Sequence, residues 1–186
     1  MHRKKPNELR IIGGEWRGRR IRFPRQPGIR PTPDRVRETL FNWLAPVVEG
    51  SRCLDLFAGS GALGLEALSR GAKAATFIES DRPTAEQLRE TIGSLAPGRA
   101  VVLQANALKW LEGPAQCFDL AFLDPPFGSG LLTEAFRKLD SGGWLSPAAC
   151  VYLELPAKDG PPQLPAGWTL HRSGKAGAVG YHLAQR

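Results

Sequence analysis

The chain has 186 residues, of which 42% are hydrophobic and 23% are charged, and its formal net charge is +7. This length suits one domain of about 150 residues with a small appendage, and the composition excludes wholesale disorder. No apolar run approaches the roughly 20 residues of a membrane span, and the charged start MHRKKPNELR lacks the apolar segment of a secretory signal. We therefore expect a cytoplasmic protein that is not anchored in a membrane.

The positive charge is concentrated at the N-terminal end. Residues 1–38 hold twelve lysines and arginines against four acidic residues, a net charge of +8, so residues 39–186 together carry −1. This asymmetry favours a polyanionic partner, and a solvated basic tail is the alternative. Strand-like runs at Leu9–Ile12 and Arg19–Phe23, separated by glycines, predict a basic β-hairpin.

A linker and a helix follow the hairpin. Residues 24–31 are rich in proline and glycine and predict a linker. Thr32 is expected to cap a helix that has Pro33 at its first position, with apolar residues at four-residue spacing beyond it. The predicted boundary lies here, between a basic hairpin and linker over 1–31 and a main domain over 32–186.

From residue 52 onward, short apolar runs alternate with helical patterns. The expected strands are Cys53–Phe57, Ala74–Glu79, Ala100–Gln104, Phe118–Leu123 and Cys150–Leu155. The expected helices are Ala62–Arg70, one that starts at Asp81 and ends before Pro97, Asn106–Leu111 and Ser129–Leu139. Such alternation predicts parallel strand pairing in a doubly wound α/β sheet.

The C-terminal end breaks this alternation. Two further strands, Trp168–Arg172 and Ala178–Ala184, are separated only by a predicted turn over Ser173–Gly177, so they must be antiparallel. The fold prediction is therefore a Rossmann-like α/β domain. Its mostly parallel seven-stranded sheet has an antiparallel C-terminal hairpin, and a small basic β-hairpin precedes it.

Cysteine and histidine usage predicts neither disulfides nor a metal site. Three cysteines lie in apolar stretches without CxxC spacing: Cys53, Cys117 and Cys150. Three histidines show no ligand or triad spacing: His2, His171 and His182. This pattern indicates buried thiols in a reducing compartment and no bound metal.

A glycine-rich turn joins the first strand of the main domain to its helix. Gly59, Gly61 and Gly64 fit the pattern G-x-G-x-x-G, which allows a tight turn and close approach of a nucleotide ligand. Glu79, at the end of the second strand, is placed to accept both hydroxyls of a ribose. Tight packing of strand against helix is the alternative explanation for the glycines.

The acid before the glycines indicates which cofactor binds. Asp55 would disfavour the pyrophosphate of a dinucleotide at the helix N-terminus, whereas it could receive the cationic amino-acid end of S-adenosylmethionine. Asp55 could also simply cap the loop backbone. Asn106 opens the helix after the third strand, where it can serve as an N-cap and lies near the expected adenine.

The tetrapeptide Asp124-Pro125-Pro126-Phe127 follows the fourth strand. Its two prolines hold the loop extended, so the Asp124 carboxylate and the Pro125 carbonyl point in set directions. Two directed acceptors suit an exocyclic amino group, and Phe127 offers a flat apolar face for an unstacked base.

These motifs together resemble a known family. FAGSG-x-LG, the acid after the second strand and the DPPF tetrapeptide resemble class I S-adenosylmethionine-dependent amino-methyltransferases. RIIGGEWRGRRI, RPTPDRVRETLFNWL, LDLFAGSGALGLEALSRGA, LDPPF and GWL resemble the RsmD-type 16S ribosomal RNA guanine-N2 methyltransferases over residues 9–155. The broader class often has Asp after the third strand and Asn at the start of the tetrapeptide. Asn106 and Asp124 match the RsmD-like subgroup instead.

The resemblance implies roles for named residues. The implied catalytic residues are Asp124, Pro125, Pro126 and Phe127. The implied S-adenosylmethionine contacts are Asp55, Phe57, Gly59, Gly61, Glu79, Asn106 and Ala107. The implied RNA contacts are Arg10, Arg17, Arg19, Arg20, Arg22, Arg30 and Arg35.

The implied substrate is 16S ribosomal RNA, free or within an assembling 30S particle, and the expected enzyme is a monomer. Methyl transfer would be a direct in-line displacement by the guanine N2 amino group, aligned by the protein. Three alternatives stay open: adenine-N6 methylation, a nicotinamide dehydrogenase, and a non-catalytic RNA-binding protein with a vestigial cofactor site. We also expect that the protein folds without residues 1–25, unless Ile11, Ile21 and Phe23 pack on the main sheet.

Overall fold

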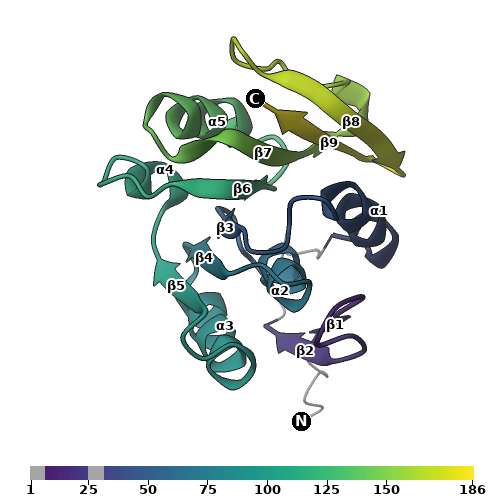
Figure 1. The fold of residues 1–186 in the computed structure, drawn as a ribbon, viewed down its shortest axis with the longest axis vertical. Coiled ribbons are helices and arrows are strands. Elements are labelled where there is room, and N and C mark those ends of the chain that lie inside the picture. The colour runs from purple at the N-terminus through teal and green to yellow at the C-terminus, as the bar shows by residue number, and fades with distance from the viewer. Residues whose placement is uncertain (1–6, 25–31) are drawn as a thin grey trace.

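A computed structural model describes residues 7–24 and 32–186 of the chain. It contains a two-stranded hairpin and a seven-stranded sheet with the order β5-β4-β3-β6-β7-β9-β8 (Figure 1). The strands are β1 (Asn7–Arg10), β2 (Arg20–Phe23), β3 (Arg52–Asp55), β4 (Ala74–Glu79), β5 (Ala100–Gln104), β6 (Phe118–Leu123), β7 (Leu145–Pro156), β8 (Thr169–Ala176) and β9 (Val179–Gln185). The helices are α1 (Asp34–Leu44), α2 (Ala62–Ser69), α3 (Arg82–Leu95), α4 (Ala107–Trp110), α5 (Leu131–Ser141) and the 3-10 turn η1 (Ala157–Asp159).

The strand directions confirm the predicted fold. Strands β3 to β7 pair in parallel, whereas β9 is antiparallel to both β7 and β8. The chain builds the sheet outward from β3 through β4 to β5 and then crosses back to place β6 on the other side of β3. Ligands of open α/β sheets bind at such a reversal, outside the carboxyl ends of the strands.

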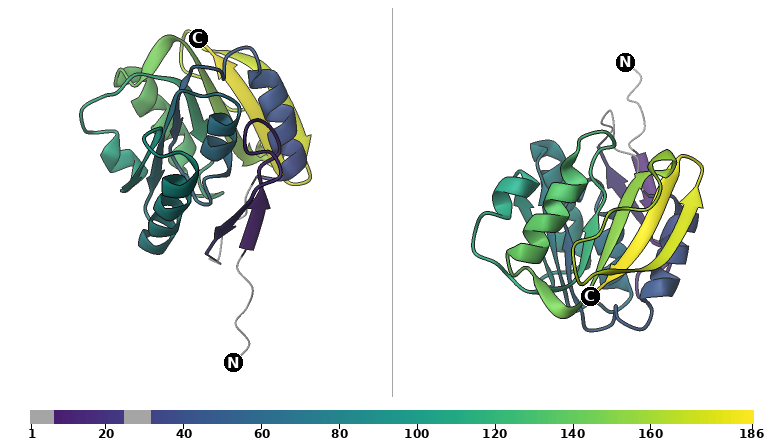
Figure 2. Two further views of the ribbon diagram at one scale, coloured as in Figure 1. Left: turned by 60° about the horizontal axis from the view of Figure 1, so that its bottom comes forward. Right: turned by 90° about the horizontal axis from the view of Figure 1, so that it is seen from above.

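The central sheet is covered on both faces (Figure 2). Helices α1, α2 and α3 share one hydrophobic core, and α4 and α5 share the other. Alternation along the strands assigns side chains to the two cores: Phe122 belongs to the first and Leu123 to the second.

The β1–β2 hairpin is packed into the first of these cores. Five of its apolar side chains are at least 94% buried there: Leu9, Ile11, Trp16, Ile21 and Phe23. The buried carboxylate of Glu66 in α2 accepts hydrogen bonds from the backbone N–H groups of Ile12 and Gly13 at 3.0 and 2.8 Å. This packing favours the alternative in which truncation exposes the core.

The same carboxylate also joins α1 and α2. Glu66 accepts from Arg37 Nη1 at 3.2 Å and from Arg70 Nε at 2.9 Å. Arg37 is fully buried and donates in addition to the carbonyl oxygen of Arg10 and to Asp34. The hairpin, α1 and α2 therefore meet at one buried ionic cluster.

The prediction that Thr32 caps helix α1 is wrong. Pro33 is the N-cap residue, and its carbonyl accepts the first helical bond from Arg37 N–H. A proline disfavours helical backbone in the residue before it, so Thr32 stays outside the helix. Its hydroxyl instead donates to Glu154 Oε1 of β7 at 2.7 Å.

The predicted turn over Ser173–Gly177 is also misplaced. Strand β8 continues to Ala176, which pairs with Val179, and the turn consists of Gly177 and Ala178. The small residues that indicated a turn have another cause, because a Cβ atom at Gly174 would lie 2.2 Å from the ring of Tyr181 on β9. Among the other boundaries, β7 begins at Leu145, five residues before the predicted start.

Candidate active site

The predicted cofactor and catalytic residues come together at the carboxyl ends of β3, β4 and β6. The loop after β3 contains the glycines, Glu79 ends β4, and the tetrapeptide follows β6. Since β4 and β6 are the two neighbours of β3 in a parallel sheet, these three loops share one edge.

The three glycines have different structural roles. Gly59 and Gly61 have positive φ angles of 51° and 75°, a backbone region that glycine adopts at little cost. A Cβ atom at Gly64 would lie 2.3 Å from the ring of Phe77 in β4, so this glycine lets the helix pack closely on the strand. A Cβ atom at Gly61 would likewise lie 2.5 Å from Leu88 of α3, so Gly61 and Gly64 both serve packing, and Gly59 is the glycine left for backbone approach to a ligand.

Asp55 is a buried carboxylate with one oxygen available to a ligand. Its Oδ2 accepts from the backbone N–H of Gly64 at 3.0 Å, so it does cap the loop. No group in the described segments donates to Oδ1, and this atom is not among the fully enclosed unpaired atoms. Burial, opposed by the Gly64 hydrogen bond and reinforced by Glu79, raises the pKa of Asp55 to about 7. A cationic group at Oδ1 would stabilise the ionised form.

Glu79 holds the glycine loop in place. Its Oε2 accepts from Gly59 N–H and its Oε1 from Asp81 N–H, both at 2.7 Å. A carboxylate has about four lone-pair sites, so Glu79 retains acceptor capacity for ribose hydroxyls.

The remaining predicted cofactor residues lie around this loop. Asn106 is exposed and caps α4, where its side chain accepts from Lys109 N–H at 3.1 Å. Ala107 is buried in the first turn of α4. Phe57 is half-buried and packs against the second core.

The tetrapeptide presents its acceptors and its aromatic ring to the outside of the fold. Asp124 is half-buried, Pro125 is buried, and Phe127 is 47% exposed. Within the described chain, no group donates to the Asp124 carboxylate or to the Pro125 carbonyl oxygen. Phe127 is one of four large hydrophobic side chains that are exposed within residues 7–24 and 32–186.

A third acid, Glu154 of β7, was missed by the sequence reasoning. It is 4% exposed, and its Oε1 accepts from the hydroxyls of Thr32 and Tyr152 at 2.7 and 2.8 Å. Burial raises the pKa of Glu154, while the two hydroxyls oppose that rise. The pKa of Asp124 is also raised, first by burial and then by the charges of Glu154 and Asp55. The signal in the sequence was a single acid within the apolar run CVYLELP.

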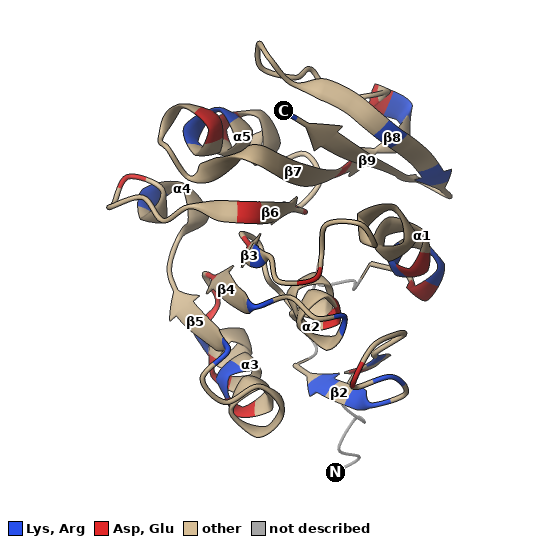
Figure 3. Ribbon diagram, viewed as in Figure 1, with Lys and Arg blue, Asp and Glu red and all other residues tan. Residues whose placement is uncertain are grey.

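The basic surface lies on the hairpin and α1. Six of the seven predicted RNA contacts are exposed: Arg10, Arg17, Arg19, Arg20, Arg22 and Arg35. The seventh, Arg30, lies outside the described residues. Figure 3 shows basic residues gathered on β2 and the adjacent loop.

Part of this surface forms a groove of about 630 Å³ between β2 and α3. Arg19, Arg20 and Arg22 line one side, and Gln87 and Thr91 line the other. Two of the arginines have an acidic neighbour, because Glu8 lies 3.5 Å from Arg20 and 3.3 Å from Arg22.

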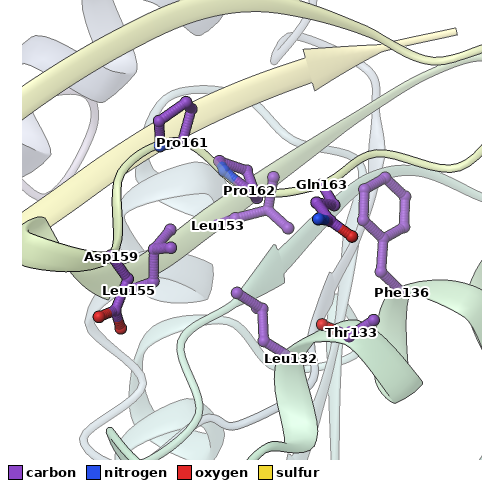
Figure 4. A pocket seen from close by; sticks show the side chains of 9 residues that line it. All are labelled: Leu132, Thr133, Phe136, Leu153, Leu155, Asp159, Pro161, Pro162 and Gln163. Atoms are coloured by element: carbon purple, nitrogen blue, oxygen red, sulfur yellow. The ribbon is translucent and has the colours of Figure 1, made fainter.

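A smaller hollow of about 200 Å³ lies between α5 and the segment after β7 (Figure 4). Leu132 and Phe136 of α5 face Leu153 and Leu155 of β7 across it, and the segment after β7 contributes Asp159, Pro161, Pro162 and Gln163. Neither of these two hollows is lined by a predicted cofactor or catalytic residue.

Neither a metal cluster nor a membrane-spanning helix is found in residues 7–24 and 32–186. No group of three or more histidine, cysteine or acidic side chains is placed to hold a metal ion there. None of the helices in those segments has the length and apolarity needed to cross a bilayer.

Known proteins resemble this chain over nearly its whole length. The family described as "Conserved hypothetical protein 95" matches residues 9–185. Ribosomal RNA small subunit methyltransferase D of Escherichia coli K12 is 52% identical, covering 98% of this chain and 95% of its own. The Haemophilus influenzae protein of the same name is 46% identical, with 96% and 94% covered.

A solved structure agrees with these relatives. The protein described as "Putative methyltransferase yhhF from Escherichia coli" superimposes with a TM-score of 0.91 at 49% identity, covering 97% of this chain and 98% of its own. Identity at this level over this length confirms the resemblance inferred from the motifs. The chain belongs to the ribosomal RNA small subunit methyltransferase D family.

Proposed function

We propose that this protein transfers a methyl group from S-adenosylmethionine to the exocyclic N2 of a guanine in 16S ribosomal RNA. The observation that carries the proposal is the pair of unpartnered acceptors, the Asp124 carboxylate and the Pro125 carbonyl, beside the glycine loop. Membership of the methyltransferase D family supports the reaction class and the small-subunit RNA substrate.

The residues around the glycine loop fit S-adenosylmethionine. The positive φ angles of Gly59 and Gly61 shape a tight loop, Glu79 has acceptors for ribose hydroxyls, and the raised pKa of Asp55 reflects a buried carboxylate in need of a cation. Asn106, Ala107 and Phe57 would line the adenine end. When bound, S-adenosylmethionine supplies an electrophilic methyl group on a sulfonium.

The protein's own part in the reaction is alignment and acceptance of hydrogen bonds. The guanine N2 lone pair is delocalised into the ring, which makes this nitrogen a poor nucleophile. Asp124 and the Pro125 carbonyl each accept one N2 hydrogen, which favours a pyramidal nitrogen whose lone pair points at the methyl group. Pro126 keeps the loop extended, and Phe127 stacks on the base. The N2–CH₃ bond would form as the S–CH₃ bond breaks, leaving S-adenosylhomocysteine, and N2 would then release one proton to solvent, so no covalent enzyme intermediate is needed.

The N-terminal segment is the proposed RNA-docking unit. We assign residues 1–31 to docking and residues 32–186 to catalysis, although the hairpin shares a core with the catalytic part. Alternation puts Arg10, Arg20 and Arg22 on the solvent face, where they can neutralise phosphates. We expect the protein to act as a monomer in the cytoplasm. Its substrate would be free 16S RNA or an assembling 30S particle.

Nucleoside analysis tests this function. The purified protein would be incubated with radiolabelled S-adenosylmethionine and either naked 16S RNA or 30S particles from a strain that lacks the gene. We expect the label in N2-methylguanosine, and none with Asp124→Ala. Label in N6-methyladenosine, incorporation into DNA, or binding of NADH in preference to S-adenosylmethionine would refute the proposal.

A further inference from the structure

Asp124 and Glu154 lie side by side at the carboxyl ends of two paired strands. Strands β6 and β7 are parallel, and Leu123 pairs with Leu153, so the two acids each follow a paired residue by one position. Neighbouring strands are about 4.8 Å apart. Alternation puts both acids on the face of Phe122 and Tyr152, whose ring centroids are 6.4 Å apart.

One oxygen of Glu154 has no partner, although its side chain is 96% buried. Thr32 and Tyr152 both donate to Oε1, and no group in residues 7–24 or 32–186 donates to Oε2. No described lysine or arginine forms an ion pair with Glu154 or Asp124 within 4.0 Å. Among the described residues, the fully enclosed side-chain atoms that lack a partner are Thr84 Oγ1 and His182 Nε2, so Glu154 Oε2 keeps some exposure to solvent.

A buried carboxylate oxygen without a donor is unfavourable, and a ligand that supplies one would relieve the cost. Ionised carboxylates only accept hydrogen bonds. The Watson–Crick edge of guanine presents donors at the adjacent N1–H and N2–H₂ groups, whereas adenine presents an acceptor at N1. Enzymes that act on an unstacked base identify it through this edge.

We propose that Glu154 selects guanine by accepting a hydrogen bond from the base N1–H through Oε2, while Asp124 and Pro125 hold the N2 amino group. Thr32 and Tyr152 are positioning residues that turn Oε2 toward the base. This inference rests on the proposed function and adds a specificity residue to it.

The substitution Glu154→Gln tests the inference because it reverses one hydrogen-bonding group. The two hydroxyls are expected to keep the amide oxygen at the Oε1 position, so the amide –NH₂ takes the place of Oε2. That group is a donor facing the N1–H donor of guanine, but it suits the N1 acceptor of adenine.

Binding of four nucleotides separates the roles of the two acids. Saturation-transfer NMR with S-adenosylhomocysteine present would rank GMP, 1-methyl-GMP, which lacks N1–H, IMP, which lacks the 2-amino group, and AMP. A hydrogen bond to a charged group changes affinity by about tenfold or more, so the wild type should prefer GMP to the other three by that factor. Glu154→Gln should lose the preference over 1-methyl-GMP and AMP and keep that over IMP.

Asp124→Ala should show the opposite pattern: it should reduce the preference over IMP, because only the Pro125 carbonyl then accepts from N2, and keep the preference over 1-methyl-GMP. Glu112→Gln, at an acid whose side chain is 64% exposed and pairs with Lys138, is the control and should retain all preferences. Thr32→Val should also lower the affinity for GMP relative to that for 1-methyl-GMP, but by a smaller factor than Glu154→Gln does.

The inference is overturned if the wild type does not rank GMP above 1-methyl-GMP, or if Glu154→Gln lowers affinity for all four nucleotides by the same factor. The latter result would indicate a structural role. Failure of the proposed function is a separate outcome, because it appears as an absence of N2-methylguanosine in RNA treated with the wild-type protein.

Discussion

Replacing Glu66 with glutamine tests whether the hairpin and the catalytic part form one cooperative unit. Its carboxylate is fully buried and accepts from four donors, at 2.8 to 3.2 Å: Ile12 N, Gly13 N, Arg37 Nη1 and Arg70 Nε. A glutamine side chain has one acceptor oxygen, and its –NH₂ group would face donors. Two or more of these hydrogen bonds must therefore be lost, and two arginines lose their shared counter-charge.

The magnitude follows from the burial of both partners. Removing one member of a buried ion pair costs about 3–5 kcal/mol. Arg37 keeps Asp34 and the carbonyl oxygens of Thr32 and Arg10, so the low end, about 3 kcal/mol, applies to Glu66→Gln. For a chain of this size each 1 kcal/mol lowers Tm by roughly 2–4 °C, which gives a fall of about 6–12 °C.

Calorimetry and amide hydrogen exchange would measure the effect. We expect one transition at a lower Tm, with the N–H groups of Ile12 and Gly13 exchanging faster than those of the sheet. Glu86→Gln is the control, because Glu86 is 53% exposed in its pair with Arg82, and it should change stability by less than about 0.5 kcal/mol. A fall in Tm below 2 °C for Glu66→Gln would refute the reasoning.

Four further predictions concern the truncation and the site. Deleting residues 1–24 removes five buried side chains worth about 1.5–3 kcal/mol each, comparable to a total stability of about 5–15 kcal/mol, so circular dichroism should show an unfolded chain. A folded truncation that binds S-adenosylmethionine would contradict this. Asp124→Ala should abolish methyl transfer and leave cofactor affinity, by calorimetry, near wild type; substantial residual kcat would show that another group orients the base. Phe127→Ala should lower kcat/KM on RNA by a factor equivalent to about 1–3 kcal/mol of lost stacking, and an unchanged value would exclude base contact. Burial raises the pKa of Asp55 to about 7, so the folded protein keeps a proton that the unfolded chain has lost, and the free energy of unfolding falls as pH rises from about 4 to 7. Asp55→Asn should flatten that fall in urea titrations without cofactor, and an unaltered slope would show that Asp55 does not cause it.

Local sequence patterns were sufficient to predict the bounds of the central strands. The bounds of β4, β5 and β6 match the prediction, because buried parallel strands are continuous apolar runs bounded by loops and caps. The turn before β9 was misplaced because Gly174 is small to fit Tyr181, a residue seven positions away that sequence alone does not place beside it. Thr32 was misassigned for a similar reason, since its partner Glu154 is 122 positions away.

The residues of the candidate site also fall into two groups: those that a local motif predicts and those that depend on contacts distant in the sequence. The glycine loop, Glu79 and the tetrapeptide each carry a signature within a few residues, so they were found. Glu154 has no such signature, because its place beside Asp124 depends on the register between β6 and β7. The shared core of the hairpin was equally hidden, since it depends on contacts between the hairpin and α2.

The distribution of charged residues indicates where the RNA backbone and the target base would bind. Three acidic side chains, Asp55, Asp124 and Glu154, lie at the carboxyl edge of the sheet, whereas exposed arginines gather on the hairpin. Phosphates are attracted to the arginines, so the backbone is held at the hairpin and outside the site. The donor edge of a guanine is neutral and complements the carboxylates. The base must then leave its stack to reach Asp124, and the cost of a few kcal/mol for that step makes unpaired guanines the favoured targets.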